Sequence, residues 1–231
     1  MPALRPRRPV AAPPDMAAFW DARAREDAEL YVDDRGLRGD AFWRGGEEVV
    51  AAFEELLALE LRGGTLVEVG CGIGRVTRVL ARRARRVVAI DVSAEMLARA
   101  RAANPGLAGV EWVLGDGTSL APVPDGAADG VFSHVVFQHV PDPRVTLGYV
   151  REMGRVLRPG GWAAFQVSDD PSVHRRRWRG RRTARHPAWR GSAVDLAALR
   201  ATAAAAGLDV VRIAGAGTQF CLVRLQAPSS R

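Results

Sequence analysis

The sequence predicts an α/β fold, a doubly wound sheet of mainly parallel strands with a helical N-terminal extension. After Gly63-Gly64, short apolar runs rich in β-branched residues alternate with segments of helical periodicity. This alternation is typical of a parallel sheet covered by helices on both faces. The first of these runs leads into a glycine-rich turn, residues 70–74, that precedes the first helix of the series.

The order of elements can be read along the main domain, residues 63–226. The expected strands are residues 65–69, 86–90, 110–114, 128–133 and 162–167, with two more at 208–213 and 219–225. The expected helices are residues 75–83, 94–103 and 143–157, and a last one that Gly207 ends. Only Ala214 to Gly217 separate the last two strands, which is too short for a helical crossover, so we expect them to be antiparallel.

Capping residues support three of these helices. Ser93 is placed to cap the helix at 94–103, and Asp142 with Pro143 opens the helix at 143–157. Ser192 with Asp195 predicts a capping box at the start of the last helix.

The ends of the chain are expected to differ from the main domain. Residues 1–14 and 227–231 lack the apolar pattern that would offset the entropy of ordering, so we expect disordered tails. Residues 15–62 predict a helical extension or lid, with helices at 15–29 and 45–61.

The composition fits a globular protein in the cytoplasm with no membrane partner. The chain has 231 residues, of which 48% are hydrophobic, and no apolar run approaches the roughly 18 residues that span a bilayer. The N-terminus lacks the apolar centre of a signal peptide. Cys71 and Cys221 have no ligand spacing around them and are expected to be free thiols, and no spacing of carboxylates or imidazoles predicts a metal site.

The positive charge is concentrated in an insertion at residues 173–191. The chain contains no Lys, so all 33 basic residues are Arg, and the formal net charge is +7. Eight of those Arg lie between His174 and Arg190 without any acidic residue, interleaved with Trp178 and Trp189. A solvated loop, a clamp for an acidic small molecule and a site for single-stranded nucleic acid all fit this composition.

The segment Val67-Glu-Val-Gly-Cys-Gly-Ile-Gly74 predicts a nucleotide-type cofactor site. Glycines remove side chains where the backbone must turn and approach a ligand, and the following helix offers unpaired N–H groups. A tight turn without a ligand is the alternative. A dinucleotide fingerprint requires glycine at position 75, where this chain has Arg75, which disfavours a nicotinamide or flavin cofactor.

Together with the acids that end the next two strands, this segment resembles the class I S-adenosylmethionine-dependent methyltransferases. Glu68-x-Gly70-x-Gly72-x-Gly74 is similar to the first motif of that family, and Asp91 to the acid that binds the ribose hydroxyls. Asp116 with Gly117 resembles the residues around the adenine ring. Residues 124–134 and 157–161 resemble the family's fourth-strand region and the turn before its fifth strand.

The resemblance implies a Rossmann-like seven-stranded sheet of order 3-2-1-4-5-7-6 with strand seven reversed, and S-adenosylmethionine as cofactor. The cofactor-binding residues that it implies are Glu68, Gly70, Cys71, Gly72, Gly74, Asp91, Val92, Met96, Asp116, Gly117, Ser133 and His134.

The acceptor is expected to be a small molecule. Val136-Phe-Gln-His139-Val-Pro-Asp142 resembles the loop after strand four in small-molecule methyltransferases, which makes His139 a candidate general base. The alternative is that His139 only bonds to the loop or shapes the pocket. The candidate substrate residues are Tyr31, Trp43, Arg44, Arg175, Arg176 and Trp178, although Phe42 and Trp43 would serve equally well to anchor the extension to the core.

We therefore expect methyl transfer to O or N of a small acceptor, acidic or not, achieved mainly by in-line positioning. The run after strand four, Ser133-His134-Val135-Val136, differs from the Asn/Asp-Pro-Pro-aromatic run of enzymes that methylate exocyclic amines. Two other interpretations stay open. One is an RNA methyltransferase that uses the Arg-rich segment, whose binding would weaken steeply with salt. The other is a non-catalytic module that binds S-adenosylmethionine.

Overall fold

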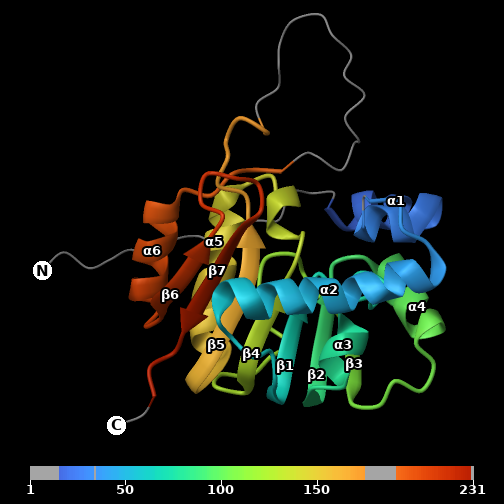
Figure 1. Ribbon diagram of the computed structural model, residues 1–231, viewed down its shortest axis with the longest axis horizontal. Helices are drawn as coiled ribbons and strands as arrows, with labels where there is room; N and C mark the ends of the chain where they lie inside the picture. The colour runs from blue at the N-terminus through green and yellow to red at the C-terminus, as the bar shows by residue number, and fades with distance from the viewer. Residues whose placement is uncertain (1–15, 34, 175–190, 230–231) are drawn as a thin grey trace, which may run out of the picture.

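The computed structural model describes residues 16–33, 35–174 and 191–229, which form a sheet covered by helices on both faces (Figure 1). The sheet has seven strands in the order β3-β2-β1-β4-β5-β7-β6. The strands are β1 (Gly63–Val69), β2 (Ala84–Asp91), β3 (Val110–Leu114), β4 (Ala128–Ser133), β5 (Leu157–Val167), β6 (Asp209–Ala214) and β7 (Cys221–Gln226). This confirms the strand order that the resemblance implies.

The pairing of the strands decides where a ligand can bind. Each of β1 to β5 is parallel to its neighbours within this group. β7 is antiparallel to both β5 and β6, and the short connection between β6 and β7 predicts the second of these pairings. The carboxyl ends of five parallel strands therefore meet at one edge of the sheet. Open α/β sheets bind their ligands at this edge.

The helices cover both faces because the parallel strands are apolar on both sides. They are α1 (Met16–Val32), α2 (Gly39–Leu57), α3 (Thr77–Ala81), α4 (Ala94–Ala103), the short 3-10 helix η1 (Phe137–His139), α5 (Pro143–Val156) and α6 (Leu196–Ala205). Successive residues of β1 alternate between two cores: Leu66 packs with α2 and α3, and Val67 packs with α5 and α6. In Figure 1, α2 crosses in front of the strands. No helix in the described part of the chain is long and apolar enough to cross a membrane.

Two of the expected caps are present and one is wrong. Ser93 Oγ accepts the N–H of Met96 at 3.0 Å, and Asp142 accepts the N–H of Arg144 at 2.9 Å. The capping box expected at Ser192 is wrong. Asp195 itself caps α6 by accepting the N–H of Ala198 at 2.9 Å, whereas Ser192 Oγ donates to the carbonyl of Val140 at 2.7 Å.

Two element boundaries differ from the sequence expectation by five residues or more. α2 begins at Gly39 rather than at residue 45, because Gly45 and Gly46 lie within the helix where it packs against Arg75. A Cβ on Gly45 would lie 2.9 Å from Arg75 Nη1. β5 begins at Leu157, five residues before its expected start, because Leu157 already pairs with Ala128; residues 158–161, expected as a turn, form an irregularity before Trp162 pairs with Gly130.

Helix α1 lies over the carboxyl ends of the strands (Figure 1). Its attachment to α4 is both apolar and polar: Ala24 and Ala28 share a buried cluster with Met96, and the Asp21 carboxylate accepts from Ser93 Oγ at 2.6 Å and from the N–H of Glu95 at 3.0 Å. A carboxylate at a helix N-terminus also interacts favourably with the helix dipole. The N-terminal extension is therefore fixed at the edge of the sheet where a ligand is expected.

Two glycines of α5 are predicted to respond to alanine in opposite directions. A methyl at Gly148 meets nothing nearer than the carbonyl of Thr118 at 3.8 Å, so Gly148→Ala should raise the free energy of unfolding by about 0.5–1 kcal/mol through helix propensity. A methyl at Gly154 would lie on the carbonyl of Ala206 and 2.9 Å from its Cβ. Gly154→Ala should lower the free energy of unfolding by about 1–3 kcal/mol. Urea denaturation measures both, and stabilisation by Gly154→Ala would contradict the packing of α5 on α6.

Candidate functional site

The glycine turn after β1 opens onto a cavity at the carboxyl edge of the sheet, called here the glycine-turn cavity. Gly70, Gly72 and Gly74 have φ of +72°, +54° and +88°, in the left-handed region that favours glycine. Gly72 has a second reason to lack a side chain, because a Cβ there would lie 2.7 Å from Cγ2 of Val32. The turn therefore packs directly against the N-terminal extension.

Asp91 joins the end of β2 to the glycine turn. Its Oδ2 accepts the N–H of Gly72 at 2.8 Å, and its Oδ1 accepts the N–H of Ser93 at 2.8 Å. The residue is 8% exposed and lines the glycine-turn cavity. Burial raises the pKa of Asp91, while its backbone hydrogen bonds oppose that rise. Each oxygen has accepting capacity left, so the carboxylate can accept further hydrogen bonds from hydroxyls of a ligand.

Most of the residues expected at the cofactor do come together. The glycine-turn cavity is lined by Glu68, Gly70, Cys71, Gly72, Asp91, Val92, Met96, Gly117 and His134. Gly74, Asp116 and Ser133 lie outside this lining. A Cβ on Gly74 would meet the ring of Trp112 at 2.6 Å, so that glycine allows packing of the turn on β3.

The contacts of Ser133 and Asp116 account for their positions. Ser133 Oγ is buried and donates to the carbonyl of Val69 at 3.0 Å, which ties β4 to β1. Asp116 is exposed, and its Oδ1 accepts the N–H groups of Thr118 and Ser119 at 2.7 Å. Asp116 thus shapes the loop between Gly115 and Gly117, both of which line the cavity.

Glu68 is a buried carboxyl in the wall of the same cavity. It is 4% exposed and accepts from Thr77 Oγ1 at 2.6 Å. Burial raises the pKa of Glu68 to about 8, with a smaller contribution from the negative charge of Asp91. A cation that enters the cavity would favour the ionised form of this carboxyl.

The N-terminal extension supplies lining residues that carry no motif. Met16, Trp20 and Val32 line the glycine-turn cavity beside Tyr31. The one signal in the sequence is that α1 places large aromatic residues on a helix with little apolar periodicity. Such residues need a surface outside their own helix to cover.

A buried ion pair lies where this cavity meets a second one. Arg75 Nη1 contacts Asp33 Oδ2 at 2.5 Å, and the two side chains are 3% and 4% exposed. Arg35 binds the same carboxylate through Nη2 at 2.6 Å and Glu48 through Nη1 at 2.9 Å. Breaking a buried pair leaves a charge without compensation. The pair therefore fixes the extension to the residue that directly follows the glycine turn.

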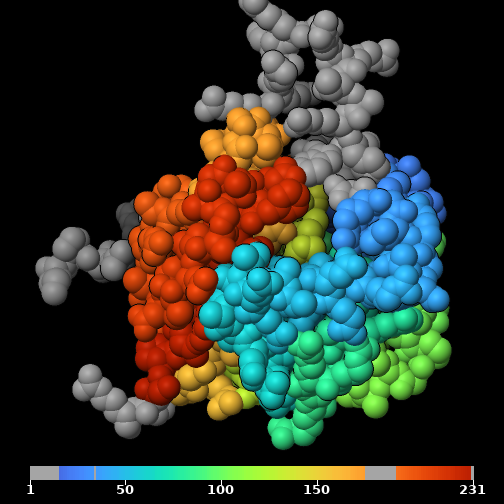
Figure 2. Space-filling view, in the orientation of Figure 1, coloured from blue at the N-terminus to red at the C-terminus, as the bar shows by residue number. Residues whose placement is uncertain are grey.

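The second cavity, called here the outer cavity, has a volume of about 980 Å³. It shares Tyr31, Val32, Arg75, His134 and Val135 with the glycine-turn cavity. Its outer walls are α2 and the segment that leads into β7, and Figure 2 shows a hollow between them. The two cavities are therefore neighbours at the carboxyl end of β4, where these residues border both.

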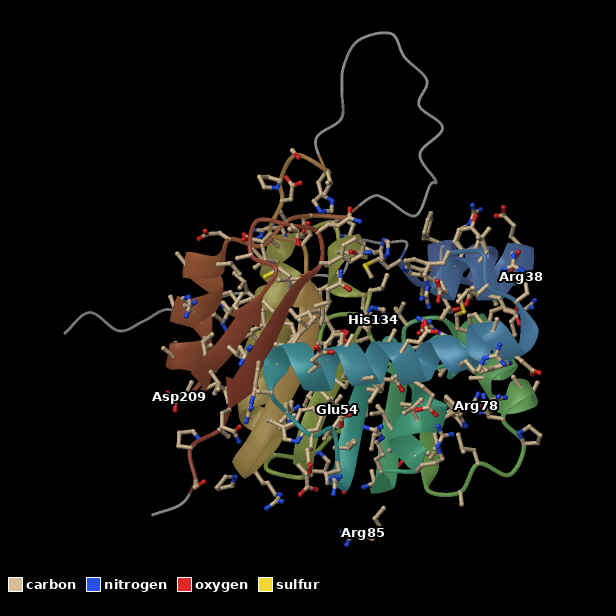
Figure 3. The ribbon with its side chains drawn as sticks, viewed as in Figure 1. Arg38, Glu54, Arg78, Arg85, His134 and Asp209 are labelled. Carbon is tan, nitrogen blue, oxygen red and sulfur yellow. The ribbon has the colours of Figure 1, made fainter. Side chains whose placement is uncertain are left out.

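His134 lies at this junction, at the opposite edge of the sheet from Arg85 (Figure 3). Burial lowers the pKa of His134 to about 3, and the charge of Arg75 adds to this effect. The ring is therefore neutral at cellular pH, with one nitrogen that donates and one that accepts. It packs edge-on against Phe53, with ring centroids 5.7 Å apart.

The loop after β4 is held by buried amides. Val135 has φ +56°, which is rare for a β-branched residue, and its N–H donates to Gln166 Oε1 at 3.2 Å. Gln166 Nε2 donates to the carbonyl of Gln219 and to Gln138 Oε1, both at 2.8 Å. Gln138 therefore turns its NH₂ group toward His139 Nε2, at 3.2 Å. When the ring of His139 is neutral, this contact requires Nε2 to accept and Nδ1 to carry the proton.

The candidate catalytic and substrate residues are placed differently from one another. His139 lines the outer cavity and packs edge-on against Trp20, with centroids 5.4 Å apart. Tyr31 lines both cavities. Trp43 and Arg44 line neither; the ring of Trp43 lies 3.4 Å from the guanidinium carbon of Arg78, which agrees with the anchoring role. The expected substrate residues Arg175, Arg176 and Trp178 lie outside the described residues.

The carboxyl groups of Asp91 and Glu68 are hydrogen-bond acceptors, which suit a polar organic ligand with hydroxyl and cationic groups. Among residues 16–33, 35–174 and 191–229, no three His, Cys, Asp or Glu side chains are grouped so that they could hold a metal ion.

Comparison with known proteins agrees with this geometry. Residues 67–165 match a family model described as a methyltransferase domain. The chain is 42% identical over 113 residues to the trans-aconitate 2-methyltransferase of Azoarcus sp. (strain BH72), covering 47% of this chain and 42% of that protein. It is 38% identical over 105 residues to the malonyl-[acyl-carrier protein] O-methyltransferase of Serratia marcescens, covering 46% of this chain and 38% of that protein. The chain thus spans less than half the length of either relative.

Solved structures match over more of the chain. The DhpI–SAH complex is 28% identical with a TM-score of 0.62, covering 93% of this chain and 96% of that one. The [4+2]-cyclase SpnF has a TM-score of 0.65 at 20% identity, covering 96% of this chain and 100% of that one, a likeness of fold alone. The matched model and the glycine turn identify residues 67–165 as a methyltransferase domain, and the sheet order is that of the class I S-adenosylmethionine-dependent methyltransferase fold.

Proposed function

We propose that this chain transfers the methyl group of S-adenosylmethionine to an oxygen or nitrogen atom of a small-molecule acceptor. The observation that supports this most strongly is that the glycine-turn cavity and the outer cavity meet at His134 and Val135. A methyl donor in the first and a nucleophile in the second would face one another there. The names of two relatives, methyltransferases of trans-aconitate and of malonyl-[acyl-carrier protein], also support it.

The cofactor would be held by the lining of the glycine-turn cavity. Asp91 would accept hydrogen bonds from the ribose hydroxyls, and Gly117 would leave room for the adenine ring. Glu68 would face the cationic methionine end, whose charge favours the ionised carboxyl. Residues 15–62 would act as the lid, since Trp20 and Val32 of this extension line the same cavity.

The rate enhancement would come mainly from orientation. The sulfonium already activates the methyl group, so the protein has to hold donor and acceptor in line. Such positioning can contribute roughly 7–11 kcal/mol. The buried amides around Val135 support this, because they fix the backbone at the place where the two ligands would meet.

Cofactor binding is predicted to depend on Asp91. Asp91→Asn keeps the shape but replaces one accepting oxygen by an NH₂ group, so affinity for S-adenosylhomocysteine should fall by about 10- to 100-fold, equivalent to about 1.5–3 kcal/mol. Asp209→Asn, at the far edge of the sheet on β6, is the matched control and should leave the affinity unchanged. Titration calorimetry measures both. Equal affinities in the two variants would rule out the ribose assignment.

The same two variants test the activity. Tritiated methyl from S-adenosylmethionine should pass into molecules of low molecular mass in a cell extract with the parent and with Asp209→Asn, and far less with Asp91→Asn. Label recovered only in RNA would support an RNA methyltransferase instead. Cofactor binding without label in any fraction would support the non-catalytic module.

We further propose that His139 serves as a general base for acceptors that must lose a proton. In the neutral ring Nε2 accepts from Gln138, so a proton can be received there only if the acceptor replaces that amide. Base catalysis of this kind contributes about 10²- to 10⁴-fold.

His139→Gln should therefore lower the single-turnover rate by about that factor and remove the rise of the rate with pH, at unchanged cofactor affinity. His174→Gln, which loses an imidazole bonded to Ser168 and outside both cavity linings, is the control. If His139→Gln stays within about threefold of the parent, catalysis rests on orientation alone.

A further inference from the structure

We infer that the acceptor has a large, uncharged and mainly apolar body, which binds in the outer cavity between Leu56 and Phe220. This inference rests on the proposed function, because it names the class of molecule that the outer cavity takes.

Exposed apolar side chains mark the rim of the outer cavity. Within the described part of the chain, the exposed large hydrophobic residues are Leu56 at 45%, Leu114 at 57%, Val211 at 50% and Phe220 at 53%. Leu56 on α2 and Phe220 before β7 both line the outer cavity. Large apolar groups that a monomer leaves exposed around one hollow are typical of a binding site, because a ligand would remove them from water.

The apolar surface continues from the rim toward the junction with the glycine-turn cavity. Val49, Ala52 and Phe53 extend it along α2, and Leu222 extends it along β7. The ring of Phe53 ends this strip, where it packs edge-on against His134. A molecule that covers the strip would therefore bring one end to the place where the methyl group is expected.

The charged side chains of the outer cavity neutralise one another. Glu48, Arg35, Asp33 and Arg75 form a chain of ion pairs with contacts of 2.9, 2.6 and 2.5 Å. Among the described lining residues, these two acids and two bases leave no net charge for an ionic acceptor, and a carboxylate beside Arg75 would also face Asp33.

The size of the outer cavity also favours a large acceptor. Its volume of about 980 Å³ lies at the upper end of the roughly 300–1,000 Å³ of ligand sites. A compact polycarboxylate would leave most of this space and both rim residues in contact with water. A larger apolar body would fill the space and cover the rim.

The inference is tested with an uncharged fluorescent aromatic probe, N-phenyl-1-naphthylamine, titrated into the full chain with and without S-adenosylhomocysteine. Leu56→Ser combined with Phe220→Ser should weaken probe binding by about tenfold or more. The control combines Leu114→Ser with Val211→Ser, which are equally exposed but line neither cavity. It should change binding by less than about twofold. All four residues are exposed, so circular dichroism should report an unchanged fold.

A competition experiment separates the two acceptor classes. Trimethyl trans-aconitate, which is uncharged, should displace the probe at lower concentration than trans-aconitate itself. The inference would be overturned if the two double variants weakened probe binding equally. It would also be overturned if trans-aconitate displaced the probe and Arg35→Gln abolished that displacement. Probe binding requires no methyl transfer. A negative result with the probe would therefore not contradict the proposed methyl transfer. Absence of methyl transfer would likewise not contradict the probe result.

Discussion

The buried contact between Arg75 and Asp33 determines how the two cavities are built. Arg75 directly follows the glycine turn, and Asp33 ends the first helical segment, so their contact draws the N-terminal extension across the strand ends. Gly45 and Gly46 make this contact possible, because a Cβ on either would meet the side chain or backbone of Arg75. Once the extension is fixed there, Val32 packs on the glycine turn and the space above the sheet is divided into two adjacent cavities.

Two unusual backbone segments meet at the junction of these cavities. The glycine turn supplies left-handed residues after β1, and Val135 adopts a similar φ after β4. A strained residue persists only where its surroundings hold it, and here the amide of Gln166, 1% exposed, bonds to its N–H. The side chain of Val136 lies against Gly70, so the two segments support each other. Such rigidity suits a site whose main task is orientation.

The sequence predicts those parts of the fold and of the site that depend on local pattern. Strand and helix periodicity gives the alternation of elements, and the glycine turn with Asp91 is recognisable because its residues lie at the ends of successive strands. Contacts between distant segments leave no such pattern. Arg75 argues against a dinucleotide, but its partner Asp33 lies 42 residues away, and nothing local links Gln166 to Gln138. Ser192 fits a capping box by spacing alone, yet Asp195 is the residue that caps the helix. The sequence does not distinguish whether Trp43 belongs to a lid or anchors the extension. The guanidinium of Arg78, which lies over its ring, favours the anchor.

Hydrogen exchange measured by mass spectrometry, with and without S-adenosylhomocysteine, tests most directly whether the cofactor lies between the glycine turn and the N-terminal extension. The amides of residues 70–76, of residues 91–96 and of residues 28–33 surround the glycine-turn cavity, so exchange in all three segments should slow together when the ligand binds. Residues 196–214, which form α6 and β6, should not change. Protection confined to the glycine turn, with residues 28–33 exchanging as fast as before, would contradict this position of the cofactor. Protection confined to residues 196–214 would place the ligand elsewhere.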